Sequence, residues 1–226
     1  MRFVRLVLVI TFKDLRAEFR TKEAINASFA FALVILLMFS FAFDTTEETT
    51  RELSGGLLWI VFAFAGTLIL NRSFARELPN DCLDALISAP VSGAALFVGK
   101  ALANYVLLLA VEMVSLPVFS IFNNVRVTTQ FPQLMLVLAL GTWALTVIGT
   151  IFSALTVNIR LREVMLPMLT YPILVPALLG AMQLTSGLIL GKPIGPDTVP
   201  WLKMLIGFDI MYTAVSVVLV ETVLVG

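Results

Sequence analysis

Six long apolar runs dominate this chain and fix what it can fold into. They cover about residues 24–43, 53–70, 101–122, 132–157, 164–190 and 202–225. A helix rises about 1.5 Å per residue, so about 20 apolar residues cross the hydrocarbon core of a bilayer. Strands of a membrane barrel alternate apolar and polar residues, and these runs do not. The pattern predicts an all-α integral membrane protein with six transmembrane helices.

The composition agrees with this fold and leaves no room for a soluble domain. Hydrophobic residues make up 59% of the 226 residues and charged residues only 13%, whereas soluble domains have about 25% charged residues. The 15 basic residues balance the 15 acidic ones, so the chain has no basic surface of the kind that binds nucleic acid. We therefore expect one transmembrane domain over residues 1–226 and no nucleic-acid partner.

The chain lacks the usual residues of catalytic and metal sites. It has no histidine, which excludes imidazole catalysis, histidine metal sites and histidine ligation of haem iron. Cys82 is the single cysteine, so neither a disulfide nor a zinc cluster can form within the chain. The segment Gly93–Ala101 resembles a phosphate loop but has the wrong glycine spacing and no Ser or Thr after Lys100. We expect no catalytic residue, metal or bound cofactor, and we expect that the chain is not an enzyme.

Lysine and arginine are distributed unequally between the two sides of the membrane. Eleven of the 15 lie before the first run or between runs two and three and runs four and five: Arg2, Arg5, Lys13, Arg16, Arg20, Lys22, Arg72, Arg76, Lys100, Arg160 and Arg162. The other side has Arg51, Arg126, Lys192 and Lys203. Because cytoplasmic loops carry the excess of basic residues, both termini are predicted to be cytoplasmic.

Residues 1–23 form an amphipathic segment that precedes the first run. On a helix, one stripe is apolar and the stripe beside it is basic: Val4, Leu8, Phe12, Leu15 and Phe19, then Arg2, Arg5, Lys13, Arg16 and Arg20. This pattern predicts an interfacial helix in the headgroup plane. It is either a simple anchor or an elbow helix that braces the membrane domain.

The loop between the second and third runs, residues 71–92, predicts a short cytoplasmic helix. Asn80 suits an N-cap after Pro79, Asp81 and Asp84 suit a first turn, and Pro90 ends the segment. Leu83, Leu86 and Ile87 then share one face. Such a helix is shaped to dock in a groove of a partner. The alternative is that its apolar face lies on the membrane surface.

The same loop resembles that of second-type ABC exporter permeases. The shared residues are Arg76-Glu77, Leu83-Asp84, Leu86, Pro90 and then Gly99-Lys100; the chain departs from the usual pattern with Asp81-Cys82 and with Asp84 in place of Glu. Within that superfamily the whole chain is similar to the CcmB family of cytochrome c maturation permeases, called haem exporter protein B. That similarity includes the amphipathic start, Gly56, Trp59, Tyr171-Pro172 and Pro176.

The resemblance implies a function and a set of partners. It implies a permease subunit for cytochrome c biogenesis, in a bacterial-type cytoplasmic (inner) membrane, that works with a separate cytoplasmic ATPase and other haem-handling subunits. ATP would bind the partner, haem would be the substrate or a haem chaperone would be released, and two permease copies would pair. The residues expected to couple to the ATPase are Arg76, Glu77, Asp81, Leu83, Asp84, Leu86, Ile87 and Pro90. Two alternatives stay open: an ABC permease for lipid, glycan or drug, and a secondary transporter or assembly factor without an ATPase.

A few polar residues and prolines lie inside the apolar runs. Glu112 lies at the middle of the third run and Asp209 about two turns into the sixth. Intramembrane carboxyl groups are costly, so each has either a functional role, as a polar lining of a pathway, or a structural role as a neutral or hydrogen-bonded group. Pro167, Pro172 and Pro176 interrupt the fifth run and predict either a bent packing helix or a broken helix that lines the pathway.

Overall fold

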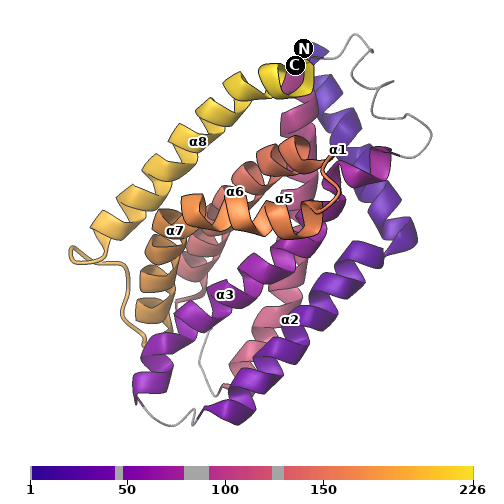
Figure 1. The fold of residues 1–226 in the computed structure, drawn as a ribbon. Coiled ribbons are helices and arrows are strands. Elements are labelled where there is room, and N and C mark those ends of the chain that lie inside the picture. The colour runs from indigo at the N-terminus through magenta and orange to yellow at the C-terminus, as the bar shows by residue number, and fades with distance from the viewer. Residues whose placement is uncertain (1, 44–47, 79–91, 124–129, 226) are drawn as a thin grey trace.

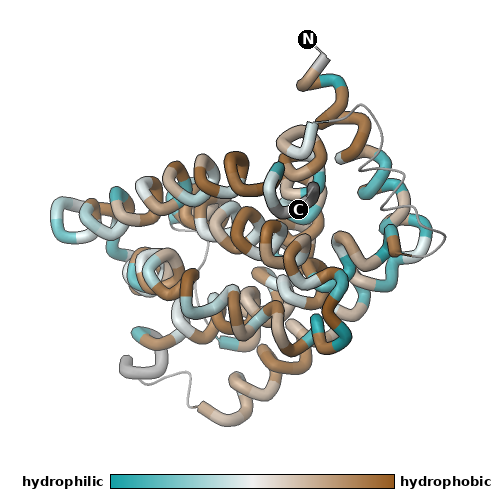
Figure 2. The backbone as a smooth tube through the Cα atoms, turned by 45° about the horizontal axis from the view of Figure 1, so that its top comes forward, coloured by the Kyte–Doolittle hydropathy of each residue, from teal (hydrophilic) through white to brown (hydrophobic). Residues whose placement is uncertain are grey.

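A computed structural model describes residues 2–43, 48–78, 92–123 and 130–225, and these residues form a helical bundle (Figure 1). The elements are α1 (Arg2–Thr21), α2 (Glu23–Ala42), α3 (Glu48–Ser73), the 3-10 helix η1 (Ala75–Glu77), α5 (Gly93–Phe122), α6 (Phe131–Thr156), α7 (Arg162–Ile189) and α8 (Val199–Val225). In the described ranges, α2, α3 and α5 to α8 are long and apolar enough to cross a membrane (Figure 2). The prediction of six membrane helices is confirmed.

Helices α3 and α6 lie at the centre of the bundle, and α2 is the most peripheral of the six. Trp59 of α3 is fully buried against Gly141 of α6, where a Cβ atom would lie only 2.1 Å from the indole ring. The Trp59 Nε1 donates a hydrogen bond to the Thr185 hydroxyl of α7 at 2.9 Å. Glycine at position 141 therefore lets the indole join three helices at the core.

Helix α5 begins earlier than the sequence predicts. The third span was expected from residue 101, but the helix starts eight residues earlier at Gly93, where the Ser92 hydroxyl accepts a hydrogen bond from the Ala95 amide. This side-chain cap satisfies one of the free amides of the first turn. Lys100 therefore lies inside the helix, in its third turn.

Helix α7 is continuous through Pro167, Pro172 and Pro176. Figure 1 shows it changing direction part-way along its length. Prolines inside a helix remove backbone donors and produce such bends. The bent form is the one that the structure adopts, and the alternative of a broken helix is wrong for α7. Pro172 and Pro176 are exposed on the outer surface of the bundle.

The chain turns sharply between α1 and α2, and this turn sets the position of α1. Lys22 adopts a left-handed backbone conformation with φ 56° and separates the two helices. Helix α1 then lies against α5 rather than continuing along α2 (Figure 1). Figure 1 also shows both termini at the end of the bundle where η1 lies.

Candidate functional site

Helix α1 packs on the bundle through a face different from the predicted apolar stripe. Val7, Ile10 and Thr11 are buried, whereas Val4 and Phe12 of the stripe are exposed. Helix α1 is therefore apolar on two sides: one contacts α5, and the other remains open to a membrane interface. The elbow alternative, in which α1 braces the membrane domain, agrees with this packing.

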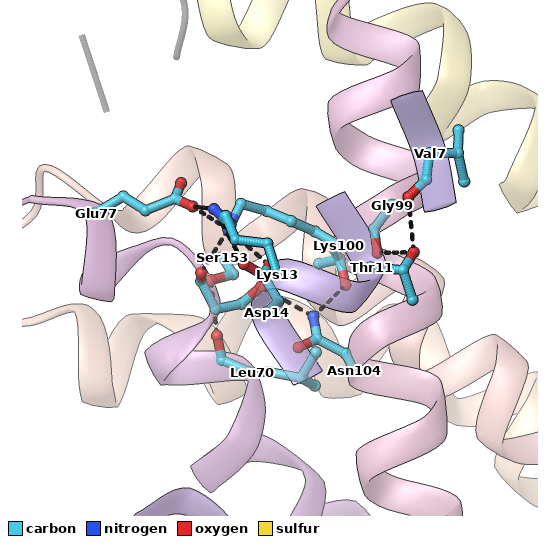
Figure 3. A network of polar contacts seen from close by, with 12 residues as sticks. Val7, Thr11, Lys13, Asp14, Leu70, Glu77, Gly99, Lys100, Asn104 and Ser153 are labelled. Atoms are coloured by element: carbon cyan, nitrogen blue, oxygen red, sulfur yellow. Dashed lines mark hydrogen bonds and ion pairs between the residues drawn. The ribbon is translucent and has the colours of Figure 1, made fainter. Parts of the chain in front are cut away.

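The contact between α1 and α5 depends on Gly99. The Thr11 hydroxyl contacts the carbonyl oxygens of Val7 at 2.9 Å and Gly99 at 3.0 Å (Figure 3). A Cβ atom at position 99 would lie 2.8 Å from the Cβ of Ile10 and 3.1 Å from the Val7 carbonyl oxygen. Only glycine lets the two backbones come this close.

A buried lysine of α5 lies at the centre of a charged group next to this contact. The Nζ of Lys100, whose side chain is 1% exposed, is 3.2 Å from Asp14 Oδ2 and 3.0 Å from Glu77 Oε1. Lys13 also reaches Glu77 Oε1, at 2.5 Å, and Asp14 Oδ1, at 3.1 Å. We call Lys13, Asp14, Glu77 and Lys100 the Lys100 cluster (Figure 3). Its two lysines balance its two carboxylates, which is the condition for burying such charges.

The Lys100 cluster joins three elements of the chain. Asp14 and Lys13 belong to α1, Glu77 ends η1, and Lys100 belongs to α5. Lys100 also donates to the Ser73 carbonyl oxygen at 2.9 Å, and its Nζ lies 4.7 Å from the centroid of the Phe74 ring. The ammonium group is therefore surrounded by oxygen atoms and an aromatic face.

The cluster also sets the charge state of Lys13. Partial burial lowers the pKa of Lys13, but the carboxylates of Asp14 and Glu77 outweigh burial, and the pKa lies above its ordinary value of 10.5. Lys13 is accordingly charged at neutral pH.

A second ion pair joins η1 to the turn between α1 and α2. Arg76 pairs with Glu18, whose carboxylate is fully buried. Glu18 Oε1 also accepts hydrogen bonds from the amides of Ala24 at 2.8 Å and Ile25 at 2.9 Å. A carboxylate at the positive end of a helix stabilises that end and satisfies its free amides. Glu18 therefore holds α1, α2 and η1 together.

A cavity of about 350 Å³ lies between α1, α3 and α5, beside the Lys100 cluster. Its lining includes the charged residues Lys13, Asp14, Glu18, Arg72, Arg76 and Glu77. Arg72 forms an ion pair with Glu23 at the start of α2. The charges that line the cavity are thus largely paired with one another.

Two of the eight predicted coupling residues, Arg76 and Glu77, are described, and both point into the contacts above. The other six lie outside the described residues: Asp81, Leu83, Asp84, Leu86, Ile87 and Pro90. The chain leaves the described part just after Glu77, at Leu78, and returns at Ser92, eight residues before Lys100. Glu77, two residues before the 79–91 segment, therefore belongs to the Lys100 cluster, and Ser92, after the segment, leads into the helix that carries Lys100.

The predicted intramembrane carboxyl groups lie elsewhere, away from this cluster. Glu112 is fully buried on α5, and its Oε2 accepts a hydrogen bond from the Thr142 hydroxyl of α6 at 2.6 Å. Asp209 is 6% exposed on α8. Pro172 and Pro176 lie on the outer surface of α7, so the structure does not bring the four predicted pathway residues together.

Sequence reasoning missed three residues of the site: Asp14, Glu18 and Lys100. Asp14 and Glu18 are acidic residues four apart on a helix that is otherwise basic, and this spacing places them on one face. That face is the one turned toward the bundle. The spacing of the two acidic residues could therefore have identified it from the sequence. Nothing local marks Lys100 as buried.

The sequence of this chain matches a known protein family. The model of the family described as CcmB protein matches residues 5–223, which include every described element from α2 to α7 completely and nearly all of α1 and α8. The chain belongs to the CcmB family. The Lys100 cluster, Glu18 and both intramembrane carboxyl groups lie inside the matched range.

Several curated relatives are similar in sequence to this chain over most of its length. Heme exporter protein B of Rhodobacter capsulatus is 31% identical over 80% of this chain and 85% of its own length. Heme exporter protein B of Paracoccus denitrificans is 30% identical over 77% and 80%. Heme exporter protein B of Haemophilus influenzae is 24% identical over 89% and 91%. The chain is thus similar to these CcmB-family proteins over nearly their full length.

Proposed function

We propose that this chain is the membrane permease subunit of an ABC transporter complex for cytochrome c biogenesis. Membership of the CcmB family and the relatives named heme exporter protein B support this proposal. ATP would be hydrolysed by a separate cytoplasmic ATPase subunit. That hydrolysis would drive either haem export or the release of a haem-loaded chaperone.

The observation that carries the proposal is the contact between Glu77, which precedes the 79–91 segment, and Lys100, which follows it. Glu77 before the segment and Lys100 after it contact one another, and both contact α1 through Asp14 or Lys13. An ATPase that pushes on this segment would therefore move α1 and α5 together. A loosely attached loop would absorb the same movement without transmitting it.

The orientation and location belong to the proposal as well. The basic-residue asymmetry supports cytoplasmic termini, and Figure 1 places both termini at the η1 end. The cytoplasmic ATPase would then meet the 79–91 segment directly. We place the protein in a bacterial-type inner membrane, as the bacterial sources of its relatives suggest.

The expected assembly contains more than one chain. We propose a permease dimer with two ATPase subunits and further haem-handling membrane subunits. The chain has no histidine, so imidazole ligation of haem would have to come from those partners.

The test is ATPase retention in a complex with an altered 79–91 segment. Leu83→Ala with Leu86→Ala removes the two leucines of the predicted docking face. We expect the ATPase to be lost from detergent-solubilised complexes while the permease still inserts normally, because truncating central anchors commonly costs about 2 kcal/mol or more each. The amount of ATPase that co-purifies is measured relative to the amount of permease.

The matched control is Ile121→Ala with Phe122→Ala. These apolar side chains are exposed at the far end of α5. The control should retain the ATPase. Equal retention in both double variants would remove the 79–91 segment from the coupling mechanism.

A further inference from the structure

Only one of the two oxygens of the buried Glu112 carboxyl group has a hydrogen-bond partner. Its Oε2 accepts the Thr142 hydrogen bond at 2.6 Å, while its Oε1 has no hydrogen-bond partner. Buried polar atoms in native proteins almost always have partners, and an exception calls for a physical reason. The free oxygen of Glu112 is therefore available to a ligand.

Asp209 repeats this situation on a neighbouring helix. It is 6% exposed, and neither of its carboxyl oxygens has a hydrogen-bond partner. Thr142, the hydrogen-bond partner of Glu112, is followed on α6 by Trp143, which packs against Tyr105 of α5. The Trp143 Nε1 donates to the Thr213 hydroxyl of α8 at 3.0 Å. These contacts place the two carboxyl groups in one region of α5, α6 and α8.

No described cation neutralises these carboxyl groups. Lys100 lies twelve residues before Glu112 on α5, about 18 Å along the helix axis. Lys203 on α8 is exposed. The apolar spans of α2, α3 and α6 carry no ionisable residue, and on α7 the exposed Glu163 lies at the first turn while Tyr171 packs on Phe64 of α3. The titratable groups of this region are therefore Tyr105, Glu112, Asp209 and Tyr212, which stacks on Phe208. Charged carboxylates in this position would be costly in a membrane.

The ligand chemistry that fits best is a proton. A metal ion would need several oxygen, nitrogen or sulfur ligands, and the described residues contain no group of three histidine, cysteine, aspartate or glutamate side chains that could supply them. A proton needs one carboxyl oxygen, which Glu112 offers directly.

Buried polar side chains lie between this region and the Lys100 cluster, although the Thr146 hydroxyl donates to the Thr142 and Trp143 carbonyl oxygens of its own helix. Thr142, Thr146 and Thr150 follow at intervals of four along α6, and all are buried. The Asn104 side chain donates to the hydroxyls of Thr150 and Ser73, both at 2.9 Å. Lys100 donates to the Ser73 carbonyl oxygen. Polar side chains of α5 and α6 thus occur at intervals from Glu112 to the η1 end of the bundle.

We propose that Glu112 and Asp209 form a proton-binding site inside the membrane, which exchanges protons with water at the η1 end through these polar side chains. The step is the transfer of one proton from water to a carboxylate oxygen, and no other bond is made or broken. The proposal rests on these contacts and does not require an ATPase partner.

The test is labelling with dicyclohexylcarbodiimide, a hydrophobic reagent that reacts with protonated carboxyl groups. The native complex is treated over a series of pH values, and modified peptides are quantified by mass spectrometry. We expect Glu112 to be labelled, and the label to decrease as the pH rises and the carboxyl group loses its proton. The exposed Glu163 should react only with a water-soluble carbodiimide.

Variants test which residues form the proton-binding site, and their readout is carbodiimide labelling rather than transport activity. Glu112→Gln should lose the label at position 112 and keep the complex intact. Thr142→Val removes the hydrogen bond to Oε2 and should shift the pH at which labelling is half complete. The matched control is Thr156→Val, because the Thr156 hydroxyl donates to a carbonyl of its own helix.

Three results would overturn the proposal. The first is no label at Glu112 at any pH, and the second is a label that is independent of pH while the complex stays intact. The third is protection by sodium ions at constant pH, which would assign the site to a metal cation. A failure of ATPase coupling leaves all of these measurements unaffected, so the two proposals can fail separately.

Discussion

The Lys100 Nζ lies 3.0 Å from the Glu77 Oε1, although the 79–91 segment separates the two residues in the sequence. This contact joins two residues that lie on either side of that segment in the sequence. Because Asp14 and Lys13 join the same group, the first helix of the chain is tied to the closure as well. The contacts therefore join α1, η1 and α5 directly to one another.

Lys100→Met should destabilise the folded chain strongly. The substitution leaves Asp14 and Glu77 with Lys13 alone, and breaking a buried ion pair from one side typically costs about 3–5 kcal/mol. Thermal unfolding of the purified protein in detergent measures the loss, with Lys192→Met, at an exposed position, as the control. Adding Glu77→Gln to Lys100→Met should cost less than the sum of the two single changes. Strict additivity would mean that the two residues do not interact.

Gly99→Ala should weaken the attachment of α1. The added Cβ would lie 2.8 Å from Ile10, and overpacking of this kind typically costs about 1–3 kcal/mol. Gly187→Ala on α7 is the matched control, because nothing lies within 4 Å of a Cβ there and alanine favours a helix by about 1 kcal/mol. Trypsin cleavage in α1 should become faster only in the Gly99 variant. Equal cleavage in both variants would contradict the close contact.

Lys13→Gln should have a small effect that does not change around neutral pH. The folded pKa of Lys13 lies above 10.5, so its stabilising contribution is complete below that value and is lost only as the pH rises past the folded pKa. The side chain is 46% exposed, which limits the contribution to about 0–1 kcal/mol. Unfolding midpoints of wild type and variant at about pH 6 and about pH 8 should differ by the same amount. A gap that widens between these pH values would show that another group is titrating.

Cysteine labelling tests the orientation of the bundle. In a Cys82→Ser background, Asp197→Cys should react with an impermeant thiol reagent in intact cells, because residue 197 is exposed in the loop between α7 and α8. Asn158→Cys, exposed between α6 and α7, should react only after lysis. The reverse pattern would place the termini outside the cytoplasm.

The sequence predicted the elements of this fold better than their contacts. The lengths of the apolar runs depend on local hydropathy, and the six spans followed from them. The start of α5 did not, because Lys100 resembles the polar end of a span when it is considered alone. Its burial depends on Asp14, 86 residues away, and on Glu77, and no local pattern contains that pairing. The spacing of Asp14 and Glu18 marks their common face in the sequence, but the ion pair between Glu18 and Arg76 of η1 does not follow from any local pattern.

Glu112→Gln should lower cytochrome c maturation while the complex still assembles. Glutamine has nearly the same shape and can keep the hydrogen bond from Thr142 through its carbonyl oxygen, so packing between α5 and α6 is preserved. It cannot take up or release a proton, so only a role that needs the carboxyl group is removed. Maturation is measured as covalently bound haem in a c-type cytochrome, and assembly as the amount of purified complex. Glu163→Gln, at an exposed position on α7, is the control and should leave both unchanged. Normal maturation in the Glu112 variant would show that a neutral buried group is sufficient at this position.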